Sequence, residues 1–224
     1  MALFDIADVE FHSQIGVPII KGASFTIEKG TTVQFEGKSG SGKSTLMKIA
    51  AGIVVPTKGT IRFEGRDVHA MNERRTRAFR KRASFIFQDS ALWANQNIMQ
   101  NLMLPLQIHN PEMTMDQKIK TIKEICSLLN YERSLELRPA DLSMGEQKKI
   151  AFARALVLKP EILFLDEVTE SLDVKAVGIV MKLLHDFIDE GKTIIYISHN
   201  PSFVKEFPAR KIILKEGIID EIQD

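Results

Sequence analysis

Residues 37–45 read Gly37-Lys38-Ser39-Gly40-Ser41-Gly42-Lys43-Ser44-Thr45, and this stretch decides the fold. It fills the pattern G-x-x-x-x-G-K-S/T, whose glycines let backbone N–H groups turn inward around an anion. An apolar run at residues 32–35 precedes it as a strand would, and a helical stripe from Leu46 onward follows it. The sequence therefore predicts a strand, a phosphate-binding loop and a helix, where the alternative is a plain Gly/Ser-rich turn.

Two side chains in this loop are expected to contact a bound phosphate chain or its metal ion. Lys43 has the reach to contact the β- and γ-phosphates, and the Ser44 hydroxyl is a ligand for Mg²⁺. The N-terminus of the following helix adds partial positive charge at the same point. We therefore predict that the chain binds a nucleoside triphosphate with Mg²⁺, and that all nine residues of the loop contact the nucleotide.

A second apolar strand ends in two carboxylates. The all-apolar run at residues 162–165 leads into Asp166 and Glu167. At the carboxyl end of a strand beside the phosphates, Asp166 orients the Mg²⁺ shell, and Glu167 acts as a general base on the attacking water. Runs as apolar as 162–165 and 193–197 are typical of a parallel sheet that is buried on both faces. The alternative for the Asp-Glu pair is a capped, solvated strand end.

Composition limits the classes of function. The chain has 224 residues, a net charge of +1 and one cysteine, Cys126. The near-neutral charge predicts no nucleic-acid partner, and a single cysteine allows no internal disulfide. No apolar stretch approaches the ~20 residues that span a bilayer, and no signal peptide is visible. The basic stretch at residues 74–82 is interpreted as a solvated helix face, with a nucleic-acid or lipid-headgroup patch as the alternative.

The hydrophobic pattern predicts an α/β fold: a P-loop NTPase core with a mostly parallel sheet, an N-terminal antiparallel β subdomain and an inserted α-helical subdomain. The chain is expected to be a single domain, residues 1–224. Its ATP-binding core with the β subdomain takes residues 1–88 and 141–224, and the helical subdomain takes residues 89–140. Further expected elements are strands at 3–12, 23–28 and 60–64, a helix capped by Thr114 and Gln117, and a closing hairpin at 211–214 and 218–222.

The stretch Leu142-Ser143-Met144-Gly145-Glu146-Gln147 resembles the L-S-G-G-Q signature of ATP-binding cassette (ABC) proteins, and the other motifs stand in that family's order along the whole chain. The resemblance implies a homodimer or paired cassette that sandwiches two ATP molecules, with the signature of one subunit over the γ-phosphate held by the other. Ser143 and Glu146 also form a capping-box pattern, which would point a helix N-terminus at the phosphate.

The resemblance also implies roles for individual residues. His199 matches the switch histidine, Gln88 the Q-loop glutamine, and Phe11 is a candidate for the aromatic ring that stacks on adenine, with an ordinary strand residue as the alternative. The implied sets are Glu167, His199 and Gln88 for catalysis; Ser44, Gln88 and Asp166 for the metal; Ser143, Met144, Gly145 and Glu146 for the signature; and Ser171, Leu172 and Asp173 for the D-loop.

The signature departs from the family's pattern at two positions. Met144 replaces a glycine, and Glu146 replaces the glutamine. A carboxylate near the partner's γ-phosphate repels it unless the side chain turns outward to cap the helix. The hypothesis is modest basal turnover that Met144→Gly and Glu146→Gln would raise.

The resemblance favours an ATPase subunit of a membrane transporter, peripheral on the cytoplasmic side and bound to integral permease subunits through the helical subdomain. Residues 88–106 resemble cassettes of Mla/MCE-type phospholipid transporters, and lipoprotein-release and FtsE-like cassettes are similar there, so phospholipid is the predicted cargo. Leu92, Trp93 and Met99 are expected to face the permease or else to pack in the core. The alternatives are a soluble or regulatory ABC ATPase, a lipoprotein- or peptide-handling system, and a scaffold that binds ATP without turnover.

Overall fold

The computed structural model describes residues 2–223, and the chain forms two compact units. One unit comprises Met1–Thr76 with Ile188–Asp224, and the other comprises Arg77–Phe187. Helices α2 (Glu73–Arg82) and α6 (Val174–Asp189) run across the two boundaries. The expected division of the chain at residues 89 and 140 stays a prediction.

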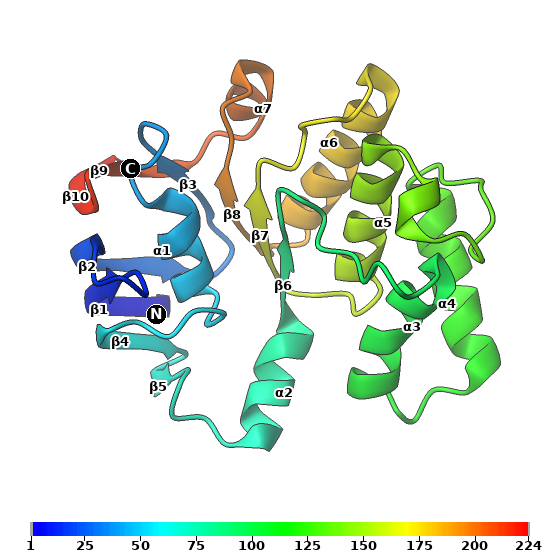
Figure 1. Ribbon diagram of the computed structural model, residues 1–224, viewed down its shortest axis with the longest axis horizontal. Helices are drawn as coiled ribbons and strands as arrows, with labels where there is room; N and C mark the ends of the chain where they lie inside the picture. Colours follow the sequence, from blue (N-terminus) through cyan, green and yellow to red (C-terminus); the bar gives the residue numbers. More distant parts are fainter. Residues whose placement is uncertain (1, 224) are drawn as a thin grey trace. The chain divides into compact units, whose positions relative to one another are not determined.

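The first unit contains an antiparallel sheet of four strands in the order β2-β1-β4-β5 (Figure 1). In β1, buried Phe4 and Ile6 flank half-buried Asp5, which is the period-two pattern of a sheet with one packed face, and Leu3 is buried as well. The second strand begins at Pro18, where the sequence predicted residue 23, because Pro18 and Gly22 obscure the alternation. The strands are β1 (Ala2–His12), β2 (Pro18–Glu28), β4 (Lys58–Phe63) and β5 (Arg66–Asp67).

Four further strands of this unit lie side by side in the order β10-β9-β3-β8. Strand β3 runs parallel to both β8 and β9, whereas β10 closes the predicted hairpin antiparallel to β9. All five residues of β8 are buried, as its unbroken apolar run predicted. The elements are β3 (Thr32–Glu36), α1 (Lys43–Ala50), β8 (Thr193–Ile197), α7 (Pro201–Glu206), β9 (Arg210–Lys215) and β10 (Ile218–Gln223).

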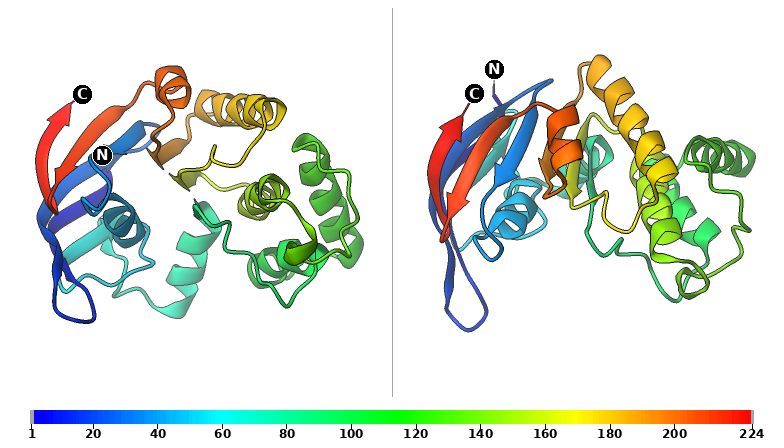
Figure 2. Two further views of the ribbon diagram at one scale, coloured as in Figure 1. Left: turned by 45° about the horizontal axis from the view of Figure 1, so that its top comes forward. Right: turned by 90° about the horizontal axis from the view of Figure 1, so that it is seen from above.

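The second unit joins a parallel strand pair to a group of helices. Strands β6 and β7 pair in parallel, and α3, α4 and α5 pack on one another (Figure 2). The predicted capping box of α4 is confirmed, because Thr114 and Gln117 exchange hydrogen bonds of 3.3 and 2.8 Å. The elements are β6 (Ala83–Ile86), α3 (Ile98–His109), α4 (Met115–Leu128), the 3₁₀ turn η1 (Pro139–Asp141), α5 (Met144–Leu156) and β7 (Ile162–Asp166).

These elements confirm the predicted α/β class with an N-terminal antiparallel sheet, a mostly parallel second set of strands and a helical region. The basic stretch is helix α2, in which only Phe79 is buried while Arg74, Arg75 and Arg77 are exposed. This pattern agrees with the interpretation of a solvated face.

Candidate functional site

The predicted phosphate loop connects β3 to α1, and its glycines occupy backbone conformations that other residues avoid. Gly37 has φ 145°, and Gly40 and Gly42 have φ 78° and 100°. A Cβ atom at Gly37 would stand 2.3 Å from the Leu214 carbonyl oxygen on β9, so the loop packs too closely for a side chain there. The glycines of the sequence pattern therefore set the shape of the loop.

The side chain of Lys43 crosses this loop. It is 7% exposed, and its Nζ donates hydrogen bonds of 2.7 and 2.9 Å to the carbonyl oxygens of Gly37 and Lys38. The Oγ of Ser41 is buried and has no hydrogen-bond partner among residues 2–223. A cavity of 540 Å³ adjoins residues 37–41. The site thus offers an ammonium group, a hydroxyl without a partner and the N-terminus of α1. These groups suit the phosphate chain of a nucleotide with its Mg²⁺.

His199 stands at the same edge of the sheet as this loop. Strands β3 and β8 are parallel neighbours, and Gln34 lies opposite Tyr196 in their register. The phosphate loop begins after Glu36, and the turn with exposed His199 begins after β8. Both segments therefore follow the carboxyl ends of adjacent parallel strands, where ligands bind in such sheets. Asn200 fixes this turn, because its Oδ1 accepts hydrogen bonds from the first turn of α7.

Phe11 lies on β1, and Ile20 of β2 lies between it and the phosphate loop. It pairs with Ile20 across β1 and β2, and a Cβ atom added at Gly42 would lie 2.8 Å from the Ile20 side chain. The Phe11 ring is half-buried. This position is compatible with a base stacked on the ring, and the role stays a prediction.

In the second unit, Asp166 ends the fully buried strand β7 and Glu167 follows it, and the two residues are 3% and 6% exposed. Glu167 has φ 48°, a left-handed conformation that is uncommon outside glycine and often occurs at functional sites. Parallel pairing places Ile86 opposite Leu165, so Gln88 follows the same edge of the β6–β7 pair. Three predicted site residues thus lie at the carboxyl ends of the neighbouring strands β6 and β7. They are the base Glu167, the metal-orienting carboxylate Asp166 and the Q-loop amide Gln88.

A residue that sequence reasoning missed holds the Q-loop. Lys148 on α5 is 2% exposed, and its Nζ donates to the carbonyl oxygens of Phe87, at 3.1 Å, and Gln88. Burial lowers the pKa of Lys148, against the opposing attraction of the carboxylates Glu170, Asp89, Asp166 and Glu167. The burial of Lys148 was indicated in the sequence by its position one helical turn before the apolar residues 151 and 152, on the same face of the helix.

The Q-loop side chain is held as well. Gln88 Nε2 donates a 2.9 Å hydrogen bond to Glu170 Oε2. Arg154 holds the segment that follows the Q-loop, because its guanidinium donates to the carbonyl oxygens of Ser90 and Ala91 and lies 5.1 Å from the Trp93 ring centre. These contacts fix the whole segment from residue 87 to 93.

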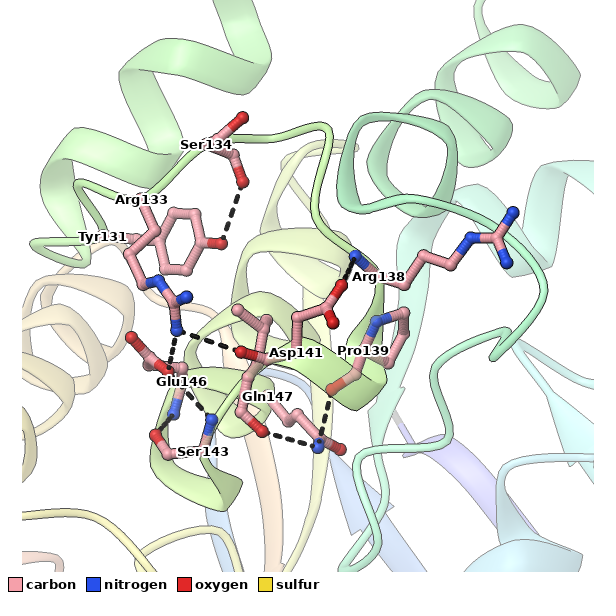
Figure 3. Close-up of polar contacts among 10 residues, drawn as sticks. Tyr131, Arg133, Ser134, Arg138, Pro139, Asp141, Ser143, Glu146 and Gln147 are labelled. Carbon is pink, nitrogen blue, oxygen red and sulfur yellow. Dashed lines mark hydrogen bonds and ion pairs between the residues drawn. The ribbon is translucent and has the colours of Figure 1, made fainter.

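The predicted capping box at the start of α5 is confirmed (Figure 3). Ser143 Oγ accepts from the Glu146 N–H at 3.2 Å, and Glu146 Oε2 accepts from the Ser143 N–H at 2.8 Å. Arg133 Nη1 lies 3.1 Å from the same Oε2. The Ser143 hydrogen bonds and the Arg133 charge lower the pKa of the Glu146 carboxyl, so Glu146 is an ionised helix cap.

The signature and D-loop meet within this unit. A Cβ atom at Gly145 would lie 2.8 Å from the Ser171 carbonyl oxygen, so only glycine permits this approach. Asp173 begins α6, because its Oδ1 accepts the Ala176 N–H at 2.8 Å. Met144, which replaces a signature glycine, is 71% exposed. The D-loop residues Ser171, Leu172 and Asp173 thus run beside the signature helix.

A family model described as "ABC transporter" matches residues 20–170, which contain the phosphate loop, the Q-loop, the signature and the carboxylates of β7. The chain belongs to the ABC transporter family. This membership agrees with the order of motifs that the sequence resemblance rested on.

Curated relatives share this cassette. The methionine import ATP-binding protein MetN of Brucella abortus is 33% identical over 203 residues, which are 90% of this chain and 54% of MetN. The octopine permease ATP-binding protein P of Rhizobium meliloti is 30% identical over 91% of this chain and 81% of its own length. The chain thus spans about half the length of the MetN protein that it matches.

A solved ABC structure shares the fold over nearly the whole chain. The dimeric, post-hydrolysis ATP-binding cassette MJ0796 bound to ADP and Pi is 27% identical, with a TM-score of 0.90 over 99% of this chain and 98% of that one. The predicted fold is therefore confirmed as that of ABC cassettes. The likeness to Mla/MCE-type and FtsE-like cassettes stays a prediction. Among residues 2–223, no helix is both long and apolar enough to cross a membrane.

Proposed function

We propose that this chain is the ATP-hydrolysing, nucleotide-binding subunit of a membrane ABC transporter. The observation that carries the proposal is the phosphate loop, in which Lys43 lies across a glycine-shaped anion site. The buried Glu167, at the end of β7, supplies the second requirement, a base for hydrolysis.

Binding follows from the first unit. The backbone N–H groups of residues 37–45 and the N-terminus of α1 hold the phosphates of ATP, and Lys43 exchanges its contacts with loop carbonyls for the β- and γ-phosphates. Ser44 and Asp166 would hold Mg²⁺, which would supply positive charge against the phosphates. Phe11 on β1 is the candidate contact to adenine.

Hydrolysis follows from the carboxylates and amides at the strand ends. Glu167 accepts a proton from the attacking water, and its unusual backbone conformation sets the direction of that carboxylate. Gln88 and His199 orient the water and the γ-phosphate. As a metal ligand, Gln88 would have to leave Glu170, its partner in this structure.

A second copy completes each site. The N-terminus of α5, with residues 143–146, contacts the γ-phosphate bound by the other subunit, and Ser171–Asp173 line the seam between them. The support is twofold: the capped helix N-terminus is a suitable anion contact, and the structurally similar MJ0796 is described as dimeric. Hydrolysis and phosphate release then open the dimer.

A groove in the second unit is the candidate contact for a permease at the cytoplasmic side of a membrane. Its cavity of 610 Å³ is lined by Trp93, Met99, Met103, Met115 and Ile119, among others, and Trp93 is 44% exposed. Methionine-rich apolar grooves adapt to an inserted helix or loop. Trp93 and Met99 were expected to face the permease, and this lining supports that expectation.

The transported substrate remains a choice between two classes. Phospholipid rests on the resemblance of residues 88–106 to lipid-transporter cassettes, whereas the similar relatives are named for methionine and octopine. The experiment is a tagged pull-down from detergent-solubilised native membranes, with proteins and bound small molecules identified by mass spectrometry. The matched control is a variant with Trp93→Ala and Met99→Ala, which removes the apolar lining of the groove.

The outcomes separate the candidates. A permease that is captured by the native chain and lost with the groove variant supports the transporter. Phospholipid captured with the permease supports lipid as cargo, while an amino-acid-binding partner favours the class for which the relatives are named. Capture of soluble proteins alone contradicts the transporter and favours a soluble or regulatory ABC ATPase.

A further inference from the structure

The signature helix α5 places a carboxylate at the end that is proposed to receive the γ-phosphate of a second copy. A helix N-terminus attracts anions through its partial positive charge and its N–H groups, which have no partner within the helix. A carboxylate in the first turn works against a phosphate there. Glu146 is such a group, and hydrogen bonds and ion pairing lower its pKa, so it keeps its negative charge at neutral pH.

Arg133 is placed to offset this charge (Figure 3). Its Nη1 lies 3.1 Å from Glu146 Oε2 and donates a second hydrogen bond, also of 3.1 Å, to the carbonyl oxygen of Asp141. One guanidinium nitrogen thus bridges the signature carboxylate and the turn just before the signature. Together with the Ser143 N–H, Arg133 holds Glu146 in the cap position.

The segment that carries Arg133 is itself anchored. Tyr131 is 7% exposed; its N–H donates to the Cys126 carbonyl oxygen at 2.9 Å and its hydroxyl to the Ser134 carbonyl oxygen at 3.3 Å. Lys149, on α5, donates to the Asn130 carbonyl oxygen at 3.2 Å. The guanidinium is therefore presented from a fixed turn, although its side chain is 45% exposed.

We propose that Arg133 is a positioning residue of the ATP-bound dimer, which neutralises Glu146 and holds it in the helix cap so that the α5 N-terminus can accept the γ-phosphate bound by a second copy. The inference rests on the proposed function. It explains how this chain carries a carboxylate in its signature without repelling the nucleotide. It also identifies a residue outside every motif that acts on the contact between subunits through Glu146.

The chain offers a closely matched control. Arg138 is exposed and lies in the same connection, but its guanidinium points away from the cluster of Glu146, Ser143 and Asp141 (Figure 3). Its backbone joins the cluster, because its N–H donates a 2.9 Å hydrogen bond to Asp141 Oδ2 and its carbonyl oxygen accepts the Asp141 N–H at 2.9 Å. Arg138→Gln therefore removes the same charge from the same segment without exposing the Glu146 carboxylate.

The test measures ATP-dependent dimerisation by analytical ultracentrifugation in a Glu167→Gln background, which is expected to retain bound ATP. We expect Arg133→Gln to weaken the dimer about 3- to 10-fold at low ionic strength, with a smaller effect at high salt. We expect Arg138→Gln to change it less than about twofold, since its charge is solvated. Adding Glu146→Gln to Arg133→Gln should restore the dimer, because the uncompensated charge is then gone.

The rescue separates an electrostatic role from a structural one. An unchanged dimer with Arg133→Gln overturns the inference, and so does a weakened dimer that Glu146→Gln does not restore. Melting temperatures of all variants verify that each is folded. If the Glu167→Gln parent forms no dimer with ATP, the proposed function is contradicted, and the inference falls with it.

Discussion

Replacing Lys148 with methionine removes a buried ammonium group and keeps a side chain of similar length. In the native chain this group donates to the carbonyl oxygens of Phe87 and Gln88 from the interior of α5. Methionine donates no hydrogen bond, so both carbonyl oxygens lose a charged donor, while the Phe87 oxygen keeps the Ser90 N–H at 3.1 Å. The Q-loop backbone then loses its link to the signature helix.

The magnitude follows from two opposing effects. Each hydrogen bond from a charged donor contributes about 1.5–3 kcal/mol, so the two together contribute about 3–6 kcal/mol. Burial of a charged group costs a few kcal/mol in proteins. Burial lowers the pKa of Lys148, and methionine avoids the cost of burying that charge. The expected net loss of stability is about 1–3 kcal/mol, or roughly 2–12 °C in melting temperature for a chain of this size.

The assay compares thermal unfolding and ATPase kinetics of Lys148→Met with those of Lys149→Met. Lys149 is the adjacent residue, half-buried, and donates one hydrogen bond to the Asn130 carbonyl oxygen. We expect Lys148→Met to lower kcat about tenfold, equal to ~1.4 kcal/mol of transition-state stabilisation, with KM for ATP nearly unchanged because the phosphate loop is intact. Equal stability and equal kcat in the two variants would refute the reasoning.

Three further predictions follow from single contacts. Gly37→Ala should weaken ATP binding at least about tenfold in a fluorescent-nucleotide titration, because its Cβ would meet the Leu214 carbonyl oxygen at 2.3 Å and its φ is 145°. Glu170→Ser should lower the Mg²⁺ concentration for half-maximal ATPase activity, since it frees the Gln88 amide; an unchanged Mg²⁺ requirement would count against this role. The folded-state pKa of Glu146 lies below its usual 4.5, so the stability that it contributes is present above that pH and is lost as pH falls through the folded value. Urea unfolding from pH 7 to 3 should therefore show the advantage of the native chain over Glu146→Gln disappearing in acid.

The parts of the fold that depend on short-range patterns could be predicted from sequence. The phosphate loop, the buried run of β7 and the capping boxes at Thr114 and Ser143 each follow from residues within a few positions of one another. The start of β2 could not be predicted as well, because Pro18 and Gly22 interrupt its alternation, and its pairing with β1 decides the strand.

The contacts that organise the site depend on partners distant in sequence. No short sequence motif includes Lys148, because its hydrogen-bond partners are carbonyl oxygens 60 and 61 positions earlier. The sequence indicated that Glu146 could cap its helix, yet the ion pair with Arg133 is a product of the turn after α4. If Arg133 neutralises Glu146 as proposed, Glu146→Gln alone should change ATPase activity little, contrary to the sequence-based hypothesis that it raises turnover.

The central claim is that this chain hydrolyses ATP with Glu167 as the base. The most direct measurement is release of inorganic phosphate by the purified chain with ATP and Mg²⁺, beside Glu167→Gln and the binding of labelled ATP to both. The account predicts steady phosphate release by the native chain, and for Glu167→Gln undiminished ATP binding with release reduced at least about a hundredfold. Phosphate release by Glu167→Gln at the native rate would contradict it.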